Sequence, residues 1–403
     1  MSGPRISVVG IGADGWAGLA ADSQRALADA EVVWGGRRQL DLLPADVTAA
    51  REPWPTPLTP ALPALLDRYA GRRVAVLASG DPMWFGIGAT LSRLCGADRL
   101  AVLPHPSALS LAAARLGWPL DEVAVRSACG RPVAALQPAV QPGRRLLVLS
   151  AGADTPREVA ALLVARGLAD SRLTVLAQLG GPAAHTRHGV ARDWADGLAD
   201  VDPLHVLAVE CATGVPPLPT VPGLPDEVYA HDGQLTKREI RAVTVARLAP
   251  APGQLLWDVG GGAGSVAIEW ARTHRTCRAV AVERDPERAA RLGVNAAALG
   301  VPEVSVVVGT APAALADLPP PDAVFVGGGV TAPGVLDLCH AALRPGGRLV
   351  VNAVTMESEA LVLRWCAAVG GDLSRIAVSR PAAVGGFTSW RPMLPVTQWV
   401  VTR

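Results

Sequence analysis

The sequence has little lysine, few aromatic residues and no excess of charge of either sign. Of its 403 residues, 37 are lysine or arginine and 36 are aspartate or glutamate, so the formal net charge is +1. Lysine occurs once, at Lys237, and aromatic residues make up 4% of the chain. Because proteins that bind nucleic acids usually carry a basic excess, the composition gives no indication of such a partner.

Long apolar runs and paired cysteines are also missing. No run reaches the roughly 18–20 apolar residues that a membrane-spanning helix needs. The first residues lack the basic segment and apolar stretch of a signal peptide, so we expect a cytoplasmic protein without a membrane partner. The six cysteines are scattered without a C-x-x-C pair, which predicts neither a zinc site nor a disulfide framework. We therefore expect no bound metal.

The most informative stretch is 255–271, which reads LLWDVGGGAGSVAIEWA. An apolar run, a glycine cluster and a helical apolar pattern predict a buried strand, a tight turn and a helix start. Alternate positions form a D-x-G-x-G-x-G pattern, made by Asp258, Gly260, Gly262 and Gly264. Glycine lets a ligand approach the backbone, and the helix offers free N–H groups and the positive end of its dipole. The turn is therefore suited to a carboxylate, a phosphate or a ribose.

This spacing resembles the first motif of the class I methyltransferases, which bind S-adenosylmethionine. A dinucleotide fingerprint fits less well, because Ser265 stands where the third glycine or alanine belongs. Glu283 ends the next predicted strand, over 277–283, and can accept hydrogen bonds from ribose hydroxyls. A glycine turn without a ligand is the alternative. The resemblance implies cofactor contacts from Gly260, Gly261, Gly262, Ala263, Gly264 and Glu283, and from the backbone of Ala311 after the third strand.

The first half opens with a predicted strand over 5–10 that runs into Gly10, Gly12 and Gly15. These glycines form a G-x-G-x-x-G pattern, so a dinucleotide-dependent oxidoreductase is an alternative function. That reading requires an acidic residue at the end of the second strand, near 32–34, to bind the ribose. Glycines follow this strand instead, which counts against the oxidoreductase.

A second glycine motif follows the predicted strand 73–78, where the chain reads SGDPMWFG. After a further strand over 100–103, a Pro-Ser turn places Ser107 to cap a helix. The G-x-G, the G-D-P-x-x-F-G string and the Pro-Ser turn together resemble the class III tetrapyrrole (corrin/porphyrin) methyltransferases. In that family S-adenosylmethionine lies between two α/β subdomains. An ordinary turn is the alternative for the G-D-P string. The resemblance implies cofactor contacts from Gly10, Gly12, Gly80, Asp81, Met83, Phe85 and Ser107.

A proline-rich segment at 212–226 contains five prolines and no apolar period, which predicts a semi-rigid linker. It separates a first domain, 1–211, from a second domain, 227–403. The second domain opens with D-G-x-x-T-K-x-E-I-R, which resembles the decarboxylating C-15 methyltransferases of the cobalamin pathway. The resemblance implies that Thr236 contacts the cofactor, while Thr236 and Glu239 also match a helix capping box.

The motifs together predict an α/β protein with two catalytic domains. A class III tetrapyrrole-methylase fold of two α/β subdomains precedes a Rossmann-like class I S-adenosylmethionine-dependent methyltransferase fold. This order resembles the fused methyltransferases of the aerobic cobalamin route. The resemblance implies two S-adenosylmethionine sites, methylation of precorrin-6B at C-5 and C-15, and loss of CO₂ from the C-12 acetate to give precorrin-8. It also implies an anionic tetrapyrrole substrate and, by analogy, a homo-oligomer.

Polar residues at the end of the fifth predicted strand, 348–352, and just past it are candidates for handling the substrate. They are Asn352, Thr355 and Glu357. The carbons to be methylated in a reduced tetrapyrrole are already nucleophilic, so positioning can supply much of the rate without a catalytic triad or a metal. Polar loop residues without a catalytic role are the alternative.

Overall fold

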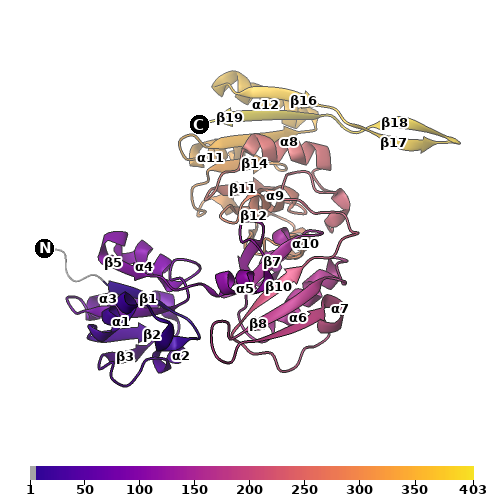
Figure 1. Ribbon diagram of the computed structural model, residues 1–403. Coiled ribbons are helices and arrows are strands. Elements are labelled where there is room, and N and C mark those ends of the chain that lie inside the picture. The colour runs from indigo at the N-terminus through magenta and orange to yellow at the C-terminus, as the bar shows by residue number, and fades with distance from the viewer. Residues whose placement is uncertain (1–5) are drawn as a thin grey trace. The chain divides into compact units, whose positions relative to one another are not determined.

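The computed structural model describes residues 6–403, which form two compact units (Figure 1). The first unit runs to Val133 and resumes over Pro142–Val215, and the second contains Ala134–Gln141 and Pro216–Arg403. Each unit is α/β, with its own sheets and its own buried core. Arg5, the first residue of the predicted N-terminal strand, lies outside the described residues. Across the described chain, no helix has both the length and the apolar character needed to cross a membrane.

The first sheet of the first unit has five parallel strands in the order β3-β2-β4-β1-β5. The strands are β1 (Ile6–Ile11), β2 (Val32–Gly35), β3 (Ala50–Pro53), β4 (Val74–Ser79) and β5 (Leu100–Leu103). The helices of this part are α1 (Ala21–Ala28), α2 (Arg37–Asp41), α3 (Leu58–Arg68) and α4 (Ile87–Cys95). The central strands β1 and β4 are almost wholly buried, as expected for parallel strands covered on both faces. Because the strands are parallel, their carboxyl ends share one edge.

The second sheet of the first unit is mixed, in the order β6-β7-β10-β8-β9. Its strands are β6 (Ala124–Ser127), β7 (Arg145–Leu149), β8 (Arg172–Ala177), β9 (His185–Val190) and β10 (His205–Glu210). Only β6 and β7 are parallel, and the other neighbours are antiparallel. The helices α5 (Ala108–Leu116), α6 (Thr155–Ala165) and α7 (Ala191–Trp194) belong to this part, and α5 packs on β7 and β10. The first unit thus contains two α/β subdomains.

The second unit is built on a seven-stranded sheet in the order β13-β12-β11-β14-β15-β19-β16. Its strands are β11 (Leu255–Val259), β12 (Arg278–Glu283), β13 (Ser305–Val308), β14 (Ala323–Val326), β15 (Arg348–Ala353), β16 (Asp372–Ile376) and β19 (Val396–Thr402). The first five are parallel, while β19 runs antiparallel to both β15 and β16. The strand order reverses between β11 and β14, which is where ligands bind in open parallel sheets.

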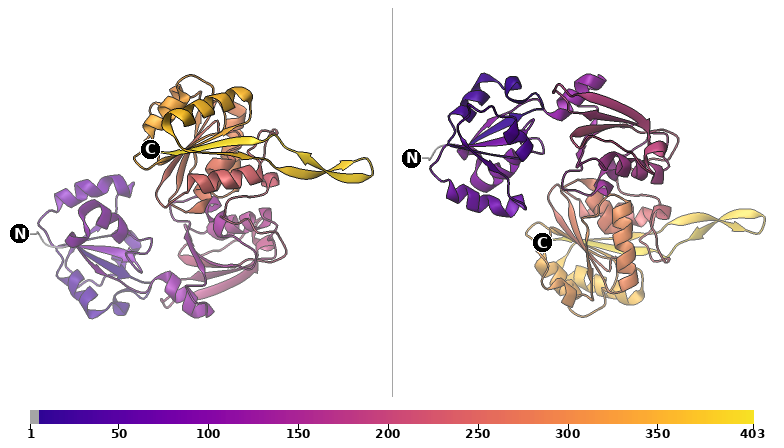
Figure 2. Two further views of the ribbon diagram at one scale, coloured as in Figure 1. Left: turned by 90° about the horizontal axis from the view of Figure 1, so that it is seen from above. Right: turned by 90° about the horizontal axis from the view of Figure 1, so that it is seen from below.

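Helices cover both faces of this sheet (Figures 1 and 2). They are α8 (Arg238–Leu248), α9 (Ser265–Thr273), α10 (Pro286–Ala298), α11 (Val335–Ala342) and α12 (Met356–Val369). All five residues of β11 are buried, and its apolar side chains divide between two clusters, with Leu256 on one face and Leu255, Trp257 and Val259 on the other. Leu256 packs with residues of α8, α9 and α10, whereas Trp257 packs with residues of α11 and α12. The two-residue period of a strand thus places an apolar layer on each face.

A short segment from the middle of the chain packs into the second unit. The 3-10 helix Val133–Ala139 carries Gln137. The side-chain oxygen of Gln137 accepts a hydrogen bond from the Arg272 guanidinium at 2.7 Å. Gln141 pairs twice with the backbone of Leu218, since its amide donates at 2.6 Å and accepts at 3.0 Å. We call residues 134–141 the strap, because both ends continue into the first unit.

Two features of the second unit differ from the predicted linker and sheet. The last residues of the proline-rich segment are built into the unit, with Leu224 and Asp226 buried. The strands β17 (Ser379–Val384) and β18 (Phe387–Pro392) form a two-stranded hairpin that projects away from the sheet (Figures 1 and 2). We call this hairpin the arm.

The pairing of Gln141 with Leu218 leads to a stability prediction. Replacing Gln141 with alanine removes both hydrogen bonds to Leu218 and a third to the Pro138 carbonyl, and it leaves the Leu218 N–H without its partner, so we expect a loss of about 1–2 kcal/mol in the free energy of unfolding. Urea unfolding monitored by tryptophan fluorescence measures this change. An unchanged free energy of unfolding would show that the strap contributes nothing through this side chain.

Candidate functional site

In the first unit, the glycine motifs meet at the carboxyl ends of β1, β4 and β5. A Cβ atom on Gly10 would lie 2.0 Å from the carbonyl oxygen of Gly80, and one on Gly80 would lie 2.9 Å from the Cα of Ser107. These backbones are in direct contact, so side chains are excluded by close packing. Ser107 accepts a hydrogen bond from the Ser110 N–H at 3.1 Å and caps α5, as predicted. The structure therefore brings together Gly10, Gly12, Gly80 and Ser107.

The G-D-P string forms a turn that exposes apolar side chains. Asp81 accepts a hydrogen bond from the Met83 N–H at 2.8 Å, which fixes the turn. Met83 and Phe85 are 47% and 40% exposed, which is unusual for such large apolar residues. Phe85 also has a φ of +56°, in the left-handed region that non-glycine residues rarely adopt. Such a conformation is strained, and strain of this kind clusters at functional sites.

A contact between His105 and Asp14 beside the first glycine loop was not predicted. His105 Nε2 lies 3.1 Å from Asp14 Oδ2, and a Cβ atom on Gly12 would lie within 3 Å of both side chains. The other carboxylate oxygen of Asp14 is buried without a hydrogen-bond partner among the described residues. The pair links the loop after β1 to the turn after β5. His105 lies in the Pro-Ser turn, but no signal in the sequence paired it with Asp14.

In the second unit, the three alternating glycines adopt positive φ angles of +77°, +55° and +81°. They do not face the same surroundings. A Cβ atom on Gly260 would lie 2.9 Å from the Gly328 backbone, and one on Gly264 would lie 2.4 Å from the Leu292 side chain. At Gly262 the nearest atom would be the Gln234 carbonyl oxygen at 3.7 Å. Gly260 and Gly264 are therefore required by packing, while Gly262 faces open space beside Gln234.

Glu283 acts directly on this glycine turn. One carboxylate oxygen accepts a hydrogen bond from the Gly262 N–H at 2.8 Å, and the other accepts one from the Asp285 N–H at 3.0 Å. The side chain is buried, and it shapes the turn in addition to any contact with a ligand. The loop after β13 lies beside it, since the Gly309 N–H donates to the Glu283 carbonyl at 2.9 Å. Ala311 follows two residues later in the same loop.

Asp258 lies beneath the turn and is fully buried. One carboxylate oxygen accepts a hydrogen bond from the Ala267 N–H at 3.0 Å, in the first turn of α9, while the other has no partner among the described residues. Burial raises the pKa of Asp258 from 3.8 to about 7, the Ala267 hydrogen bond opposes this shift, and the charge of Glu283 adds to it. A carboxyl group that titrates near neutral pH therefore supports the glycine turn.

The predicted capping box at Thr236 and Glu239 does not form. Helix α8 begins one residue later than expected, with Lys237 at its N-cap, and no side chain caps it. Glu239 instead accepts a hydrogen bond from Arg380 at 2.6 Å. The capping interpretation was wrong because this long-range ion pair takes the glutamate. No hydrogen bond to the hydroxyl of Thr236 is recorded among the described residues, and its carbonyl oxygen accepts a hydrogen bond from Arg241 at 2.5 Å.

The three candidates differ in their surroundings, and Asn352 lies within β15 and not after it. Asn352 is partly buried and bonds to Thr244 at 3.0 Å and to the fully buried Gln398 at 2.9 Å. Thr355 caps α12 through reciprocal hydrogen bonds with Ser358. Glu357 is exposed, and hydrogen bonds with its own backbone N–H and with Thr355 lower its pKa. The structure thus gives Thr355 a local structural role, and the catalytic roles of all three stay predictions.

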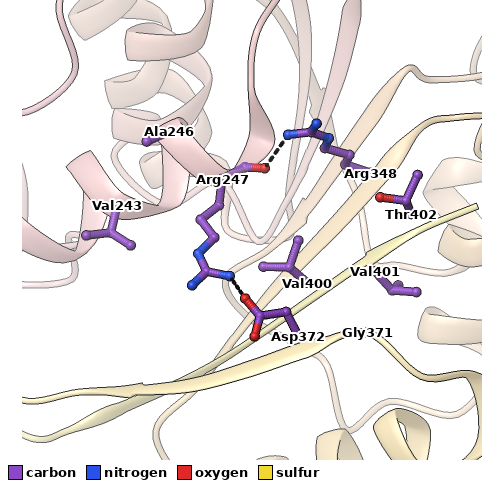
Figure 3. A pocket seen from close by; sticks show the side chains of 9 residues that line it. All are labelled: Val243, Ala246, Arg247, Arg348, Gly371, Asp372, Val400, Val401 and Thr402. Carbon is purple, nitrogen blue, oxygen red and sulfur yellow. Dashed lines mark hydrogen bonds and ion pairs between the residues drawn. The ribbon is translucent and has the colours of Figure 1, made fainter.

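A hollow of about 650 Å³ lies on the same sheet, away from these residues (Figure 3). Arg247 and Arg348 project into it, and the figure shows the Arg247 side chain paired with Asp372. Arg348 is the first residue of β15 and pairs with Thr402, so the hollow lies at the amino ends of the parallel strands. The glycine turn follows the opposite end of β11. None of the predicted site residues lines the hollow.

Comparison with known proteins agrees with this arrangement. The family model for tetrapyrrole (corrin/porphyrin) methylases matches residues 5–195, and the model for a precorrin methyltransferase domain matches residues 227–403. A Sinorhizobium protein named precorrin-6Y C(5,15)-methyltransferase [decarboxylating] is 47% identical, over 99% of this chain and 97% of its own. A Mycobacterium tuberculosis protein of the same name is 49% identical, over 99% of this chain and 100% of its own. The chain belongs to this family.

Membership in the precorrin-6Y C(5,15)-methyltransferase family makes the protein a methyltransferase enzyme and implies the use of S-adenosylmethionine. The predicted α/β fold class is confirmed, and the oxidoreductase alternative receives no support. One similar solved structure is the C-terminal domain of a precorrin-6Y C5,15-methyltransferase from Rhodobacter capsulatus. It is 44% identical, covers 46% of this chain and 100% of its own, and has a TM-score of 0.44.

The raised pKa of Asp258 predicts how stability depends on pH. The folded protein keeps this proton up to about pH 7, whereas the unfolded chain loses it near pH 3.8, so this residue's contribution to stability falls as pH rises through that window. An Asp258→Asn variant cannot titrate, and we expect it to gain stability relative to the wild type between pH 5 and 7, by at most about 1.4 kcal/mol per pH unit.

Urea unfolding of both proteins at pH 5, 6, 7 and 8 measures this difference. Because asparagine keeps an acceptor for the Ala267 N–H, the variant isolates the titration from the hydrogen bond. A stability difference that does not change with pH would show that Asp258 is ionised throughout this range.

Proposed function

We propose that the protein methylates C-5 and C-15 of precorrin-6B and releases CO₂ from the C-12 acetate side chain, which gives precorrin-8. The supporting observation is that both units carry a glycine-rich turn at the carboxyl ends of parallel strands, each in a domain matched by a methyltransferase family model. Each turn would hold its own S-adenosylmethionine, which supplies an electrophilic methyl group bonded to a sulfonium. We propose the domain limits 1–211 and 227–403 for the two activities.

The residues of the first turn fit such a cofactor. The contact between Gly10 and Gly80 holds the loops after β1 and β4 together at the carboxyl ends of the strands, where ligands bind in parallel sheets. Met83 and Phe85 offer exposed apolar surface beside Asp81, as a large, partly apolar ligand requires. Gly12 and the Ser107 hydroxyl complete the set that we assign to this cofactor.

The second turn also fits. Gly262 faces open space, and the turn from Gly260 to Gly264, including Gly261 and Ala263, leads directly into α9. The buried carboxylate of Glu283 fixes the Gly262 N–H and lies where a ribose would be recognised. We assign the hydroxyl of Thr236 and the backbone N–H of Ala311 to the same cofactor.

The proposed chemistry requires positioning more than acid–base catalysis. The ring carbons of a reduced tetrapyrrole are nucleophilic, and holding carbon, methyl group and sulfur in line supplies much of the rate. Asn352, near the carboxyl end of β15, forms a hydrogen-bonded cluster with the fully buried side chains of Thr244 and Gln398. We propose that Asn352, Thr355 and Glu357 handle the acetate that loses CO₂.

We further propose that the protein is a homo-oligomer in which the arm contacts a second copy. Phe387 is 84% exposed and Trp390 is 72% exposed, and β17 and β18 pair only with each other among the described strands. A two-stranded hairpin is marginally stable in water, and its free edges can pair with another chain. A second copy is always available to cover such a surface. Cytoplasmic localisation stays a prediction.

Matched substitutions in the two turns test the proposal of two sites. Arginine at Gly12 or at Gly262 would extend over the adjacent turn. At Gly12 its Cβ would meet only the ends of the Asp14 and His105 side chains, and at Gly262 the nearest atom is 3.7 Å away. We expect wild-type protein to bind two molecules of S-adenosylhomocysteine per chain, and each variant to bind one, by titration calorimetry.

Product analysis by mass spectrometry then assigns the activities. We expect Gly262→Arg to retain C-5 methylation and lose both C-15 methylation and CO₂ release, and Gly12→Arg to show the opposite pattern. Circular dichroism checks that each variant is folded. One binding site in the wild type, or loss of both methylations in a folded variant, would contradict two independent sites.

The arm provides a separate test of the oligomer. We expect the double variant Phe387→Ser and Trp390→Ser to lower the mass in solution, measured by light scattering, because serine removes most of the apolar surface that a second copy would bury. Val221→Ser is the control, since Val221 is 70% exposed outside the arm. An unchanged mass for the double variant would show that the arm does not hold copies together.

A further inference from the structure

A buried ionic cluster holds the segment that carries Thr236. Arg241, on α8, is fully buried, and its guanidinium donates hydrogen bonds to four residues. It donates to Glu269 at 2.6 Å, to Asp226 at 3.1 Å and to the carbonyl oxygen of Thr236 at 2.5 Å, and it also bonds to the Leu224 carbonyl. We call this group of side chains the Arg241 cluster. It ties the start of the second domain to the residue before the N-cap of α8.

Glu269 connects the cluster to the helix that follows the glycine turn. It lies in α9 and accepts hydrogen bonds from the backbone N–H groups of Gly223 and Leu224, at 2.6 and 2.9 Å, and from the Tyr229 hydroxyl at 3.1 Å. Burial raises the pKa of that hydroxyl well above its usual value, so Tyr229 stays a donor. The glycine turn and the Thr236 segment are therefore fixed to a common centre.

The outer side of the cluster is closed by a residue from the arm. Arg380, in β17, donates to Glu239 at 2.6 Å and to Asp226 at 3.3 Å. Asp226 thus bridges two arginines, the buried Arg241 and the half-exposed Arg380. The hydrogen bond from Arg380 also lowers the pKa of Glu239, so this carboxylate stays charged at neutral pH.

The loop 232–236 lies between this cluster and the glycine turn. At its start, Asp232 is held by Arg288 at 2.8 Å and by Arg291 at 3.4 Å, both on α10. At its end, Thr236 is held by Arg241. Between these two points, the Gln234 carbonyl lies 3.7 Å from where a Cβ of Gly262 would be. A shift at the Thr236 end would therefore move the loop over the open side of Gly262.

We propose that Arg380 is a positioning residue for the second cofactor site. It acts on Asp226 and Glu239, and through them on the Thr236 end of the loop 232–236. This inference rests on the proposed function, because it takes the turn at Gly262 to be a cofactor site. The Arg380–Glu239 pair is 42% and 43% exposed, and such pairs add little to overall stability. Its effect is expected in the placement of the loop and not in folding.

Replacing Arg380 with glutamine tests the proposal in the full-length protein. We expect affinity for S-adenosylhomocysteine at the second site to fall about three- to tenfold, as for loss of one charged hydrogen bond, with the first site unchanged. For C-15 methylation, we expect the KM for S-adenosylmethionine to rise by the same factor with kcat preserved, because loop placement affects ground state and transition state alike. Amide hydrogen exchange in residues 232–237 should become faster.

Arg391 provides a matched control on the same arm. It pairs with Arg380 across the two strands, and no ion pair is recorded for it among the described residues. Arg391→Gln removes the same charge and should leave second-site affinity and hydrogen exchange unchanged. Arg380→Lys keeps the charge but cannot bridge two carboxylates as a planar guanidinium does, so it should give an intermediate affinity.

The outcomes separate the inference from the proposed function. If wild-type protein does not bind S-adenosylhomocysteine at the second turn, the proposed function fails. If it binds there and Arg380→Gln has wild-type affinity and hydrogen exchange, only the positioning role of Arg380 is wrong. Equal effects of Arg380→Gln and Arg391→Gln would assign the change to arm charge in general and would also overturn the inference.

Discussion

The structure of the second unit depends on hydrogen-bond acceptors for the free N–H groups between the end of β11 and the start of α9. The strand ends in a turn whose three alternating glycines have positive φ angles, and the helix begins immediately after it. Two buried carboxylates take up N–H groups of this region, Glu283 at Gly262 and Asp258 at Ala267. Acceptors supplied from neighbouring parts of the fold leave the open side of the turn available to a ligand. The Arg241 cluster then fixes α9 against the segment that covers this side.

The sequence was most informative where local geometry alone requires particular residue types. The turn at Gly260–Gly264 was predictable because positive φ and close backbone approach admit almost only glycine. The strands around both turns were predictable from short apolar runs bounded by glycine and proline. Ser107 was correctly assigned as a cap because its partner is only three residues away.

Features that depend on distant partners were not predictable. Glu239 fits a capping box in sequence, but Arg380 binds it across 141 residues, and the helix starts elsewhere. Glu269 stands as a lone charge in an apolar helical run, a signal that a buried partner exists, but the sequence does not identify Arg241. The arm was not predicted, because a two-residue turn at Gly385 and Gly386 gives no indication that a hairpin leaves the sheet.

The strap determines what happens when the two halves of the chain are separated. Its eight residues lie in sequence within the first half, yet Gln137 and Gln141 complete hydrogen bonds of Arg272 and Leu218. No single cut in the proline-rich segment can therefore yield a second half with all of its native partners. A separately encoded version would lack the Gln137 acceptor and would leave the Arg272 guanidinium with the carbonyl oxygens of Leu299, Leu218 and Pro219.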